Sequence, residues 1–305
     1  EKGICDVDFV ICNTDYQALR NSPIPCKIQL GKELTAGHGA GNNPAMGEKS
    51  AQESLADIEA ILKKDTRMAF ITAAMGGGTG TGAAPVIARL SKDMGILTVG
   101  IVSVPARFEG PKRLDQARDG LRRLKDHVDC LIVIDNEKIK SIYGSQTISQ
   151  AFAKANDVLN IAAKGIAEII TLPGYINVDF ADVRTVMTDS GVAIMGAAQA
   201  SGEDRAIRAI TEALESPLLN NNDILGAKDI LLNITSGTDE ITMDEMSQIT
   251  SHIIRKVGNN AAVIWGVGTD PDLGDAVSVT IIATGFPTGD IELFGEENTL
   301  SLIHI

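Results

Sequence analysis

The chain of 305 residues is 44% hydrophobic and 22% charged, so it can bury a sizeable core and global disorder is excluded. Its formal net charge of −13 argues against nucleic acid or anionic lipid as the main partner, because both select basic surfaces. With only 4% aromatic residues and 30 glycines, the composition favours an α/β protein over a β-sandwich.

The first half of the chain alternates segments typical of strands and of helices. The strand-like segments are continuous apolar runs, as expected of parallel strands covered on both faces. Strands joined by helices through right-handed crossovers predict a doubly wound parallel sheet. The expected strands are residues 7–12, 68–74, 96–102 and 129–134, and the expected helices are 44–64, 79–94 and 111–127.

A long helix is expected over residues 149–171, ended by Leu172-Pro173-Gly174. Apolar residues cover much of its circumference, which indicates a helix buried between two bodies of protein. We therefore expect one domain at 1–148 and a second, smaller α/β domain at 173–305, joined by a central helix at 149–172. The strands expected in the second domain are 191–198, 229–235, 261–268 and 276–284, and its helices are 203–214 and 243–257.

The cysteines carry no sign of a metal or disulfide framework. Cys5, Cys12, Cys26 and Cys130 form no CxxC pair and have no His at metal-ligand spacing. Cys12 and Cys130 lie in apolar runs, where cysteine is usually a small buried hydrophobic residue. This pattern indicates a reducing cytoplasm. No apolar run approaches the roughly 20 residues that span a bilayer, so direct membrane insertion is not expected.

The sharpest motif is a glycine-rich turn, AMGGGTGTG at residues 74–82, between an expected strand and an expected helix. Consecutive N–H groups in such a turn, with the positive end of the helix dipole, form a cradle for a phosphate. Glycine permits close approach, and the two threonines add hydroxyl donors. The residues expected to bind phosphate are Gly76, Gly77, Gly78, Thr79, Gly80, Thr81 and Gly82.

Two common nucleotide motifs do not fit this turn. A Rossmann fingerprint requires GxGxxG and an acidic residue that ends the next strand, whereas Asp93 precedes that strand. A P-loop requires Lys after its last glycine, and none follows here. An oxidoreductase with an atypical glycine loop stays an alternative, although the four His are scattered without partners.

At these residues the chain resembles the FtsZ family, the tubulin-like GTPases of bacterial cell division. The resemblance covers nearly the whole chain, and it implies a GTP-binding domain, a long central helix and a C-terminal activation domain. The motifs that carry it, in family order, are CNTDYQAL (12–19), GAGNNP (39–44), the glycine turn with AAPV (83–86), FEGPKR (108–113), NVDFADVRTVM (177–187), ASGEDRA (200–206) and TIIATG (280–285).

The resemblance implies GTP and GDP as ligands, with Mg²⁺ held mostly by phosphates and water and by no protein metal cluster. It places Glu109 at the ribose and Arg113 at the sugar–phosphate region, although their i,i+4 spacing also fits a surface ion pair. It makes Asn136, Phe152 and Asn156 guanine contacts. From the sequence alone, Phe152 would be interpreted as a core residue.

Asp179 and Asp182 stand three residues apart at an expected helix start, so both carboxylates share one face near the positive end of the dipole. N-capping by Asp179 is an alternative role, but it leaves Asp182 unexplained. The resemblance implies that both, with Asn177, position the attacking water at the GTP of the next subunit in a head-to-tail filament. The expected partners are further copies of the chain and, through a tail outside this sequence, adaptor proteins of the mid-cell division ring in the cytoplasm.

Some features differ from the family's pattern. The family has a first strand and a first glycine-rich phosphate loop before the point where this sequence begins, which predicts weak GTP binding or aggregation for this chain alone. Ala74 stands where the family usually has Gly, and a positive φ there would strain it. Residues 298–305 do not resemble the family's last strand, so we expect a fragment. A non-hydrolysing structural relative of tubulin stays an alternative, but it would lack the paired carboxylates.

Overall fold

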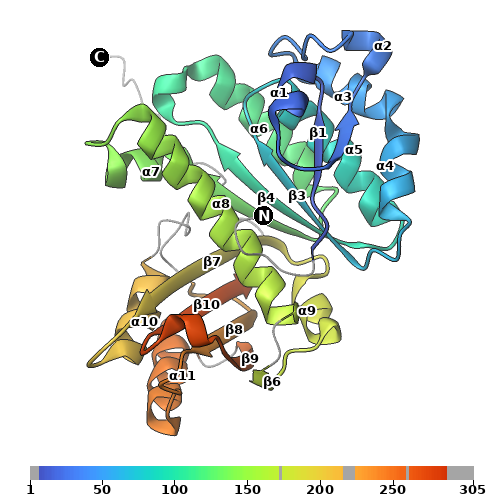
Figure 1. Cartoon of the computed structure of the whole chain (residues 1–305). Helices are drawn as coiled ribbons and strands as arrows, with labels where there is room; N and C mark the ends of the chain where they lie inside the picture. Colours follow the sequence, from blue (N-terminus) through green and yellow to red (C-terminus); the bar gives the residue numbers. More distant parts are fainter. Residues whose placement is uncertain (1–6, 172–173, 216–223, 259–260, 287–305) are drawn as a thin grey trace, which may run out of the picture.

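The structure is a computed structural model that describes residues 7–171, 174–215, 224–258 and 261–286, with the backbone only for Ile148, Phe152 and Ala155. The expectations for Cys5, for the helix stop at Leu172-Pro173 and for residues 298–305 lie outside these residues. Figure 1 shows an upper and a lower body, with the long helix α8 (Ile148–Thr171) running obliquely between them.

One sheet of eight strands runs through both bodies, in the order β3-β4-β5-β7-β10-β8-β9-β6. Strands β3, β4 and β5 are parallel, as their continuous apolar runs predict. Strand β7, which was expected in the second domain, continues this parallel sheet, because residues 130–132 of β5 pair with 191–193 of β7. In the second half β10 is antiparallel to β7 and β8, while β8 and β9 are parallel. The strands are β3 (Met68–Ala74), β4 (Leu97–Val104), β5 (Cys130–Asp135), β6 (Gly174–Ile176), β7 (Gly191–Ala200), β8 (Asp229–Ser236), β9 (Ala262–Thr269) and β10 (Val277–Thr284).

The first strand of the chain lies outside this sheet. Strand β1 (Val10–Asn13) pairs in parallel with β2 (Cys26–Gln29) in a separate two-stranded sheet. The sequence predicted β1 within the doubly wound sheet and missed β2, because CKIQ is only four residues long and follows two prolines. Two short helices, α1 (Tyr16–Asn21) and α2 (Lys32–Thr35), flank β2 along the chain.

The helix expected over 44–64 is two helices. They are α3 (Pro44–Glu53) and α4 (Leu55–Leu62), separated at Ser54. The Ser54 hydroxyl accepts from Gly31 N at 3.1 Å and donates to Gln29 O at 3.4 Å, so this side chain ties the break to the end of β2. The remaining helices are α5 (Thr79–Asp93), α6 (Pro111–Lys125), α7 (Asn136–Tyr143), α9 (Phe180–Met187), α10 (Arg205–Leu214) and α11 (Met243–Val257).

Helices cover both faces of the sheet. Helices α5 and α6 pack on one face of the first half, where the cluster includes Ala88 and Leu121. Helix α8 packs on the other face through Ala162 and Ile166, in a cluster that also holds residues of β7, β8 and β10. Helices α10 and α11 cover the outer face of the second half. A helix apolar around much of its circumference thus lies between both halves, as the sequence predicts.

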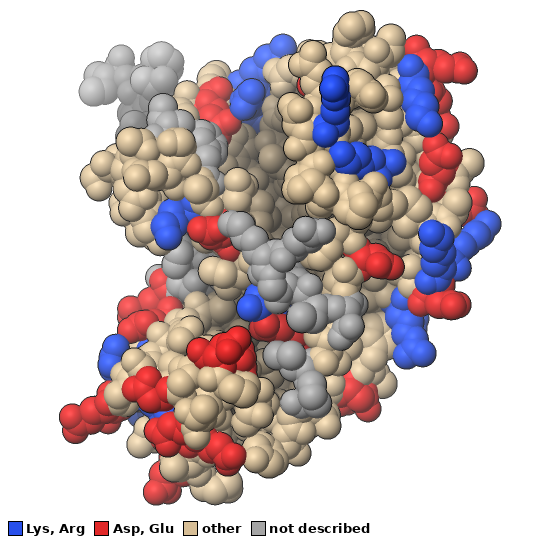
Figure 2. Space-filling view, in the orientation of Figure 1, with Lys and Arg blue, Asp and Glu red and all other residues tan. Residues whose placement is uncertain are grey.

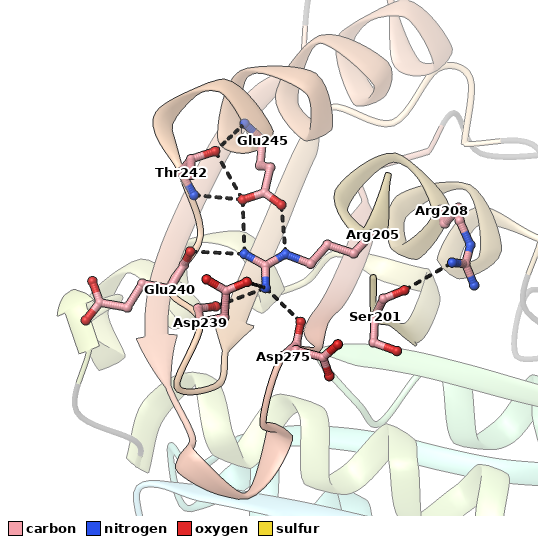
Figure 3. A network of polar contacts seen from close by, with 8 residues as sticks. All are labelled: Ser201, Arg205, Arg208, Asp239, Glu240, Thr242, Glu245 and Asp275. Atoms are coloured by element: carbon pink, nitrogen blue, oxygen red, sulfur yellow. Dashed lines mark hydrogen bonds and ion pairs between the residues drawn. The ribbon is translucent and has the colours of Figure 1, made fainter. Parts of the chain in front are cut away.

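A buried arginine holds together one end of the second half (Figure 3). Arg205 is 5% exposed, and its Nε and Nη2 donate to the Glu245 carboxylate at 2.7 and 3.2 Å. Its Nη1 donates to the Asp239 carboxylate at 2.9 Å and to Asp275 O at 2.7 Å, and Nη2 donates to Glu240 O at 3.0 Å. The guanidinium therefore joins the start of α10 to the start of α11 and to two loops.

We expect Arg205→Ala to lower the free energy of unfolding by about 3 to 5 kcal/mol, because it leaves Glu245 partly buried without its counter-charge. Arg208→Ala on the same helix is the matched control, since Arg208 makes only an exposed contact to Ser201 O, and should stay within about 0.5 kcal/mol. Urea unfolding measures both.

The same network predicts an acid transition. The hydrogen bond from Arg205 lowers the pKa of Glu245 from its usual 4.5 to about 2. The unfolded chain therefore binds this proton more readily, so the stabilisation is complete above about pH 4.5 and is lost as the pH falls towards 2. If Arg205→Ala and the unmodified chain lost stability in parallel over this pH range, the assignment would be wrong.

Candidate functional site

The phosphate, ribose and base candidates meet at one edge of the sheet. Because β3, β4 and β5 are parallel and in register, their carboxyl ends at Ala74, Val104 and Asp135 lie side by side. The glycine turn, the FEGPKR segment and Asn136 follow these three ends directly. Ligands of open α/β sheets bind at this edge.

A hydrogen bond between two of its own residues holds the glycine turn in shape. Gly76 has a φ of +94°, and its N–H donates to Thr81 Oγ1 at 2.9 Å. Thr81 is fully buried. Its hydroxyl thus fixes the turn, whereas the sequence predicted a donor to the ligand. Ala74 ends β3 and is not among the described residues with positive φ, so the strain expected there is absent.

Close packing or a positive φ explains four of the five glycines in the turn. A Cβ on Gly78 would lie 2.8 Å from Asn43 N, and one on Gly80 would lie 2.5 Å from Ala74 O. A Cβ on Gly82 would overlap Pro44 O, and Gly76 requires its positive φ. Gly77 differs, because a Cβ there would meet nothing within 4 Å. Neither packing nor φ requires glycine at Gly77, and the space beside its Cα is open.

Helix α5 begins at this open position. Its N-cap is Gly78, which has no side chain, so the N–H groups of the first turn receive no capping bond from that residue. The Thr79 hydroxyl contacts the Thr14 hydroxyl at 2.7 Å. The GAGNNP segment lies against the turn, as the contact between Gly78 and Asn43 shows. The arrangement fits the phosphate cradle that the sequence predicts.

Glu109 and Arg113 contact each other. Arg113 Nη1 donates to Glu109 Oε2 at 2.8 Å, and Ala106 N donates to Glu109 Oε1 at 3.0 Å. The Glu109 side chain is 14% exposed and that of Arg113 is 50% exposed. The i,i+4 ion pair is therefore formed, and a half-exposed guanidinium retains donors for a ligand at the same edge.

A buried acceptor without a partner lies at the third strand end. Within the part of the chain that the structure describes, Asn136 Oδ1 accepts no hydrogen bond. The preceding Asp135 caps α7, and burial raises its pKa. Asn156 is exposed on α8, one turn beyond Phe152, whose side chain lies outside the described residues. A buried orphan acceptor is costly unless a ligand or water supplies the donor.

Sequence reasoning missed Gln116 in the same region. Its Nε2 donates to Asn42 O at 3.1 Å, while its Oε1 is a second buried acceptor with no hydrogen-bond partner among the described residues. No local pattern marks this residue, because only the packing of α6 beside the GAGNNP segment brings the two together. Among the described residues, no group of three His, Cys, Asp or Glu could hold a metal ion.

The paired carboxylates form a capping box at the start of α9. Asp182 N donates to Asp179 Oδ1 at 2.9 Å, and Asp179 N donates to Asp182 Oδ2 at 3.3 Å. Capping thus explains Asp182 as well as Asp179, contrary to the sequence argument. One oxygen of each carboxylate stays outside these bonds. Asp179 is exposed and Asp182 half-buried, and neither points into the core.

Asn177 precedes this box and holds the chain that leads into it. Its Oδ1 accepts from Gly174 N at 2.7 Å, so the side chain bonds back to the first residue of β6. The Asn177 side chain is exposed. The three residues predicted to act together therefore lie within one exposed segment before and at the start of α9.

This acid segment and the glycine cradle lie at opposite edges of the first-half sheet. Helix α8 leaves the cradle edge and has 24 residues, which span about 36 Å. Helix α9 leads into β7, whose first residue Gly191 pairs with Cys130 at the start of β5. The structure therefore places the glycine turn, the FEGPKR segment and Asn136 at one edge of the sheet and the acid segment at the other.

Charge divides between the two halves. Residues 1–148 hold 19 Lys and Arg against 18 Asp and Glu, whereas residues 149–305 hold 8 against 22, so the net charges are +1 and −14. Figure 2 shows acidic side chains with few Lys and Arg over the lower body, whereas the upper body carries side chains of both signs. No described helix is long and apolar enough to cross a membrane.

Known proteins match both halves of the chain. Residues 4–144 match the GTPase domain of the Tubulin/FtsZ family, and residues 191–287 match the C-terminal domain of the FtsZ family. The cell division protein FtsZ of Porphyromonas gingivalis is 49% identical over 92% of this chain and 62% of its own length. That of Coxiella burnetii is 47% identical over 93% of this chain and 73% of its own length.

A solved structure of an FtsZ protein has the same fold. An empty FtsZ dimer from M. jannaschii superposes with a TM-score of 0.89 and 43% identity, and the match covers 96% of this chain and 84% of that one. The chain spans 62% of the length of the P. gingivalis relative.

Gly77→Ala tests the open position. We expect nucleotide binding to weaken about tenfold with an unchanged melting temperature, because a methyl group there meets the ligand and no protein atom. Gly82→Ala is the matched control and should cost about 1 to 3 kcal/mol of stability by overpacking. Thermal melts and labelled-nucleotide titration separate the two, and a Gly77→Ala protein that bound nucleotide normally would contradict the cradle.

Proposed function

The chain belongs to the FtsZ family of tubulin-like GTPases, and from this premise we propose that it binds GTP at the glycine cradle, assembles head to tail and hydrolyses GTP between two subunits. The resulting filament serves cell division in the cytoplasm, at the division site. The observation that carries this proposal is the placement of the cradle and the acid segment at opposite edges of one sheet.

The cradle binds the phosphates through backbone groups. The first-turn N–H groups of α5 and the open surface at Gly77 face the triphosphate, with Thr79 beside them and Gly76, Gly78, Gly80, Thr81 and Gly82 shaping the turn. Arg113 faces the sugar–phosphate region, and Glu109 orients it through their ion pair and contacts the ribose. Mg²⁺ bound to phosphates and water would neutralise part of the phosphate charge.

Base recognition centres on Asn136. Guanine presents ring and exocyclic N–H donors on its pairing edge, and Asn136 Oδ1 is a buried acceptor that lacks a donor. Binding guanine would supply that donor and remove the cost of the orphan group. We assign Asn156 and Phe152 to the same base site through the family resemblance, with the ring of Phe152 stacking on the base.

The acids act on the nucleotide of another subunit. Asp179 and Asp182 each retain one carboxylate oxygen outside the capping box, at an exposed helix start. These oxygens orient the attacking water in line with the terminal phosphate, and Asn177 fixes the segment that carries them. The capping box holds both carboxylates in place before the subunits meet, so little reorganisation is needed on assembly.

Head-to-tail contact follows from the geometry. A rigid subunit that presents the cradle at one edge and the acids at the other completes a site only with a second copy. Because each copy repeats the arrangement, the contact is heterologous, and a heterologous contact whose rotation does not close into a ring builds a filament.

Asp182→Asn is the sharpest single test. Asparagine keeps a capping acceptor and removes the charge, so the variant should bind GTP and sediment as filaments, while phosphate release per sedimented subunit falls about a hundredfold or more. Asp57→Asn, an exposed carboxylate on α4 that lies 4.0 Å from Lys32, is the control and should behave like the unmodified chain. Normal phosphate release from filaments of Asp182→Asn would refute the role of this carboxylate.

A further inference from the structure

A polar cluster at the amino edge of the first-half sheet belongs to neither the glycine cradle nor the acid segment. Lys92 lies in the last turn of α5, and its Nζ is 2.7 Å from Asp189 Oδ1 and 3.3 Å from Asp129 Oδ1. The same ammonium donates to Val128 O at 3.2 Å. One cation thus bridges two carboxylates, one of them at the start of β5 and the other in the turn between α9 and β7.

Asp129 anchors this cluster to the sheet. It is 5% exposed, and its Oδ2 accepts from Thr98 N at 2.9 Å. Its backbone O accepts from Gly191 N at 3.1 Å and from the Ser190 hydroxyl at 3.3 Å. The turn after α9 is therefore fastened to β5 by backbone bonds, and Lys92 adds the bond to α5.

The contact between Lys92 and Asp189 joins the carboxyl end of α5, which begins at the glycine cradle, to the carboxyl end of α9, which begins at the acid segment. Helix α5 begins at the glycine cradle and has 15 residues, so Lys92 lies about 20 Å from the cradle along a rigid rod. Helix α9 begins at the capping box of Asp179 and Asp182, and Asp189 follows two residues after its end. Lys92 and Asp189 therefore connect the end of α5 directly to the turn after α9.

We propose that Lys92 and Asp189 are positioning residues that fix the acid helix α9 relative to the nucleotide helix α5 within one subunit. The inference rests on the proposed function, because the position of α9 matters for turnover only if its carboxylates complete a neighbouring site. Buried Val183, Val186 and Met187 set the depth of α9 in the core. Apolar contacts alone allow α9 to rotate or slide more easily than a hydrogen bond does, because a hydrogen bond requires a defined direction. The bond from Lys92 to Asp189 therefore restrains these motions at the end of α9.

The electrostatics keep the bridge closed. Burial acts to lower the pKa of Lys92, but the hydrogen bond to Asp189 and the two carboxylate charges outweigh it and raise the pKa. Lys92 is therefore a cation over the whole range in which the protein would work. The Asp189 side chain is 74% exposed, so it can be changed without opening the core.

Asp189→Gly tests the proposal. Asp189 has a φ of +49°, which glycine adopts without strain, and the change leaves the pair of Lys92 with Asp129 in place. We expect phosphate release per sedimented subunit to fall about three- to fivefold, while the GTP affinity of unassembled subunits changes less than about twofold. Asp189→Asn keeps an acceptor but no charge, so its phosphate release should lie between those of Asp189→Gly and the unmodified chain. Lys92→Arg keeps the charge and should retain most of the turnover.

Asp93→Asn is the matched control. Asp93 adjoins Lys92, and its exposed ion pair with Arg89, at 3.6 Å, touches neither the sheet nor α9. It should leave affinity, assembly and turnover unchanged. Unchanged turnover in Asp189→Gly, or parallel loss of affinity and melting temperature, would overturn the positioning role.

Failure of the proposed function has a different signature, namely no GTP turnover by the unmodified chain. Hydrogen exchange of residues 180–187 tests the bridge in that case as well, because it needs no nucleotide. We expect faster exchange there in Asp189→Gly than in the unmodified chain, and equal exchange overturns the inference.

Discussion

Rigid separation of two incomplete sites is the constraint on which the account depends. Helix α8 is buried against strands of both halves, and β5 pairs directly with β7, so the two halves share one core and one sheet. The glycine cradle lies at the carboxyl edge of that sheet and the capping box of α9 lies beyond its amino edge. A close-packed interior resists the large rearrangement that would bring them together in one molecule.

Most functional candidates also have a structural role. Asp179 and Asp182 cap α9 with one oxygen each, Thr81 shapes the glycine turn, and Glu109 holds Arg113. Hydrogen bonds within the chain therefore orient these side chains before a ligand binds. Substitutions that remove these side chains are therefore expected to disturb folding, so changes that keep the hydrogen bond and remove only the charge are more informative.

The sequence predicted the parallel strands β3, β4 and β5, the long helix and a glycine turn between β3 and α5, since continuous apolar runs and clustered glycines are strong local signals. It did not predict the break at Ser54, because that break depends on a hydrogen bond to Gly31, which is remote in the chain. Strand β2 and helix α7 were too short for a clear pattern. The reciprocal capping by Asp182 was visible in the spacing but assigned only to catalysis, and the orphan acceptor of Gln116 required tertiary packing.

Complementation between two inactive variants tests the shared site most directly. Subunits with Asp182→Asn keep the cradle and lose the acid, while subunits with Gly77→Val keep the acids and block the cradle. If the site forms between copies, a mixture that co-sediments should regain about a quarter of the normal phosphate release, although neither variant alone releases phosphate. A mixture that co-sediments in the same filaments and stays as inactive as its parents would contradict a site made by two subunits.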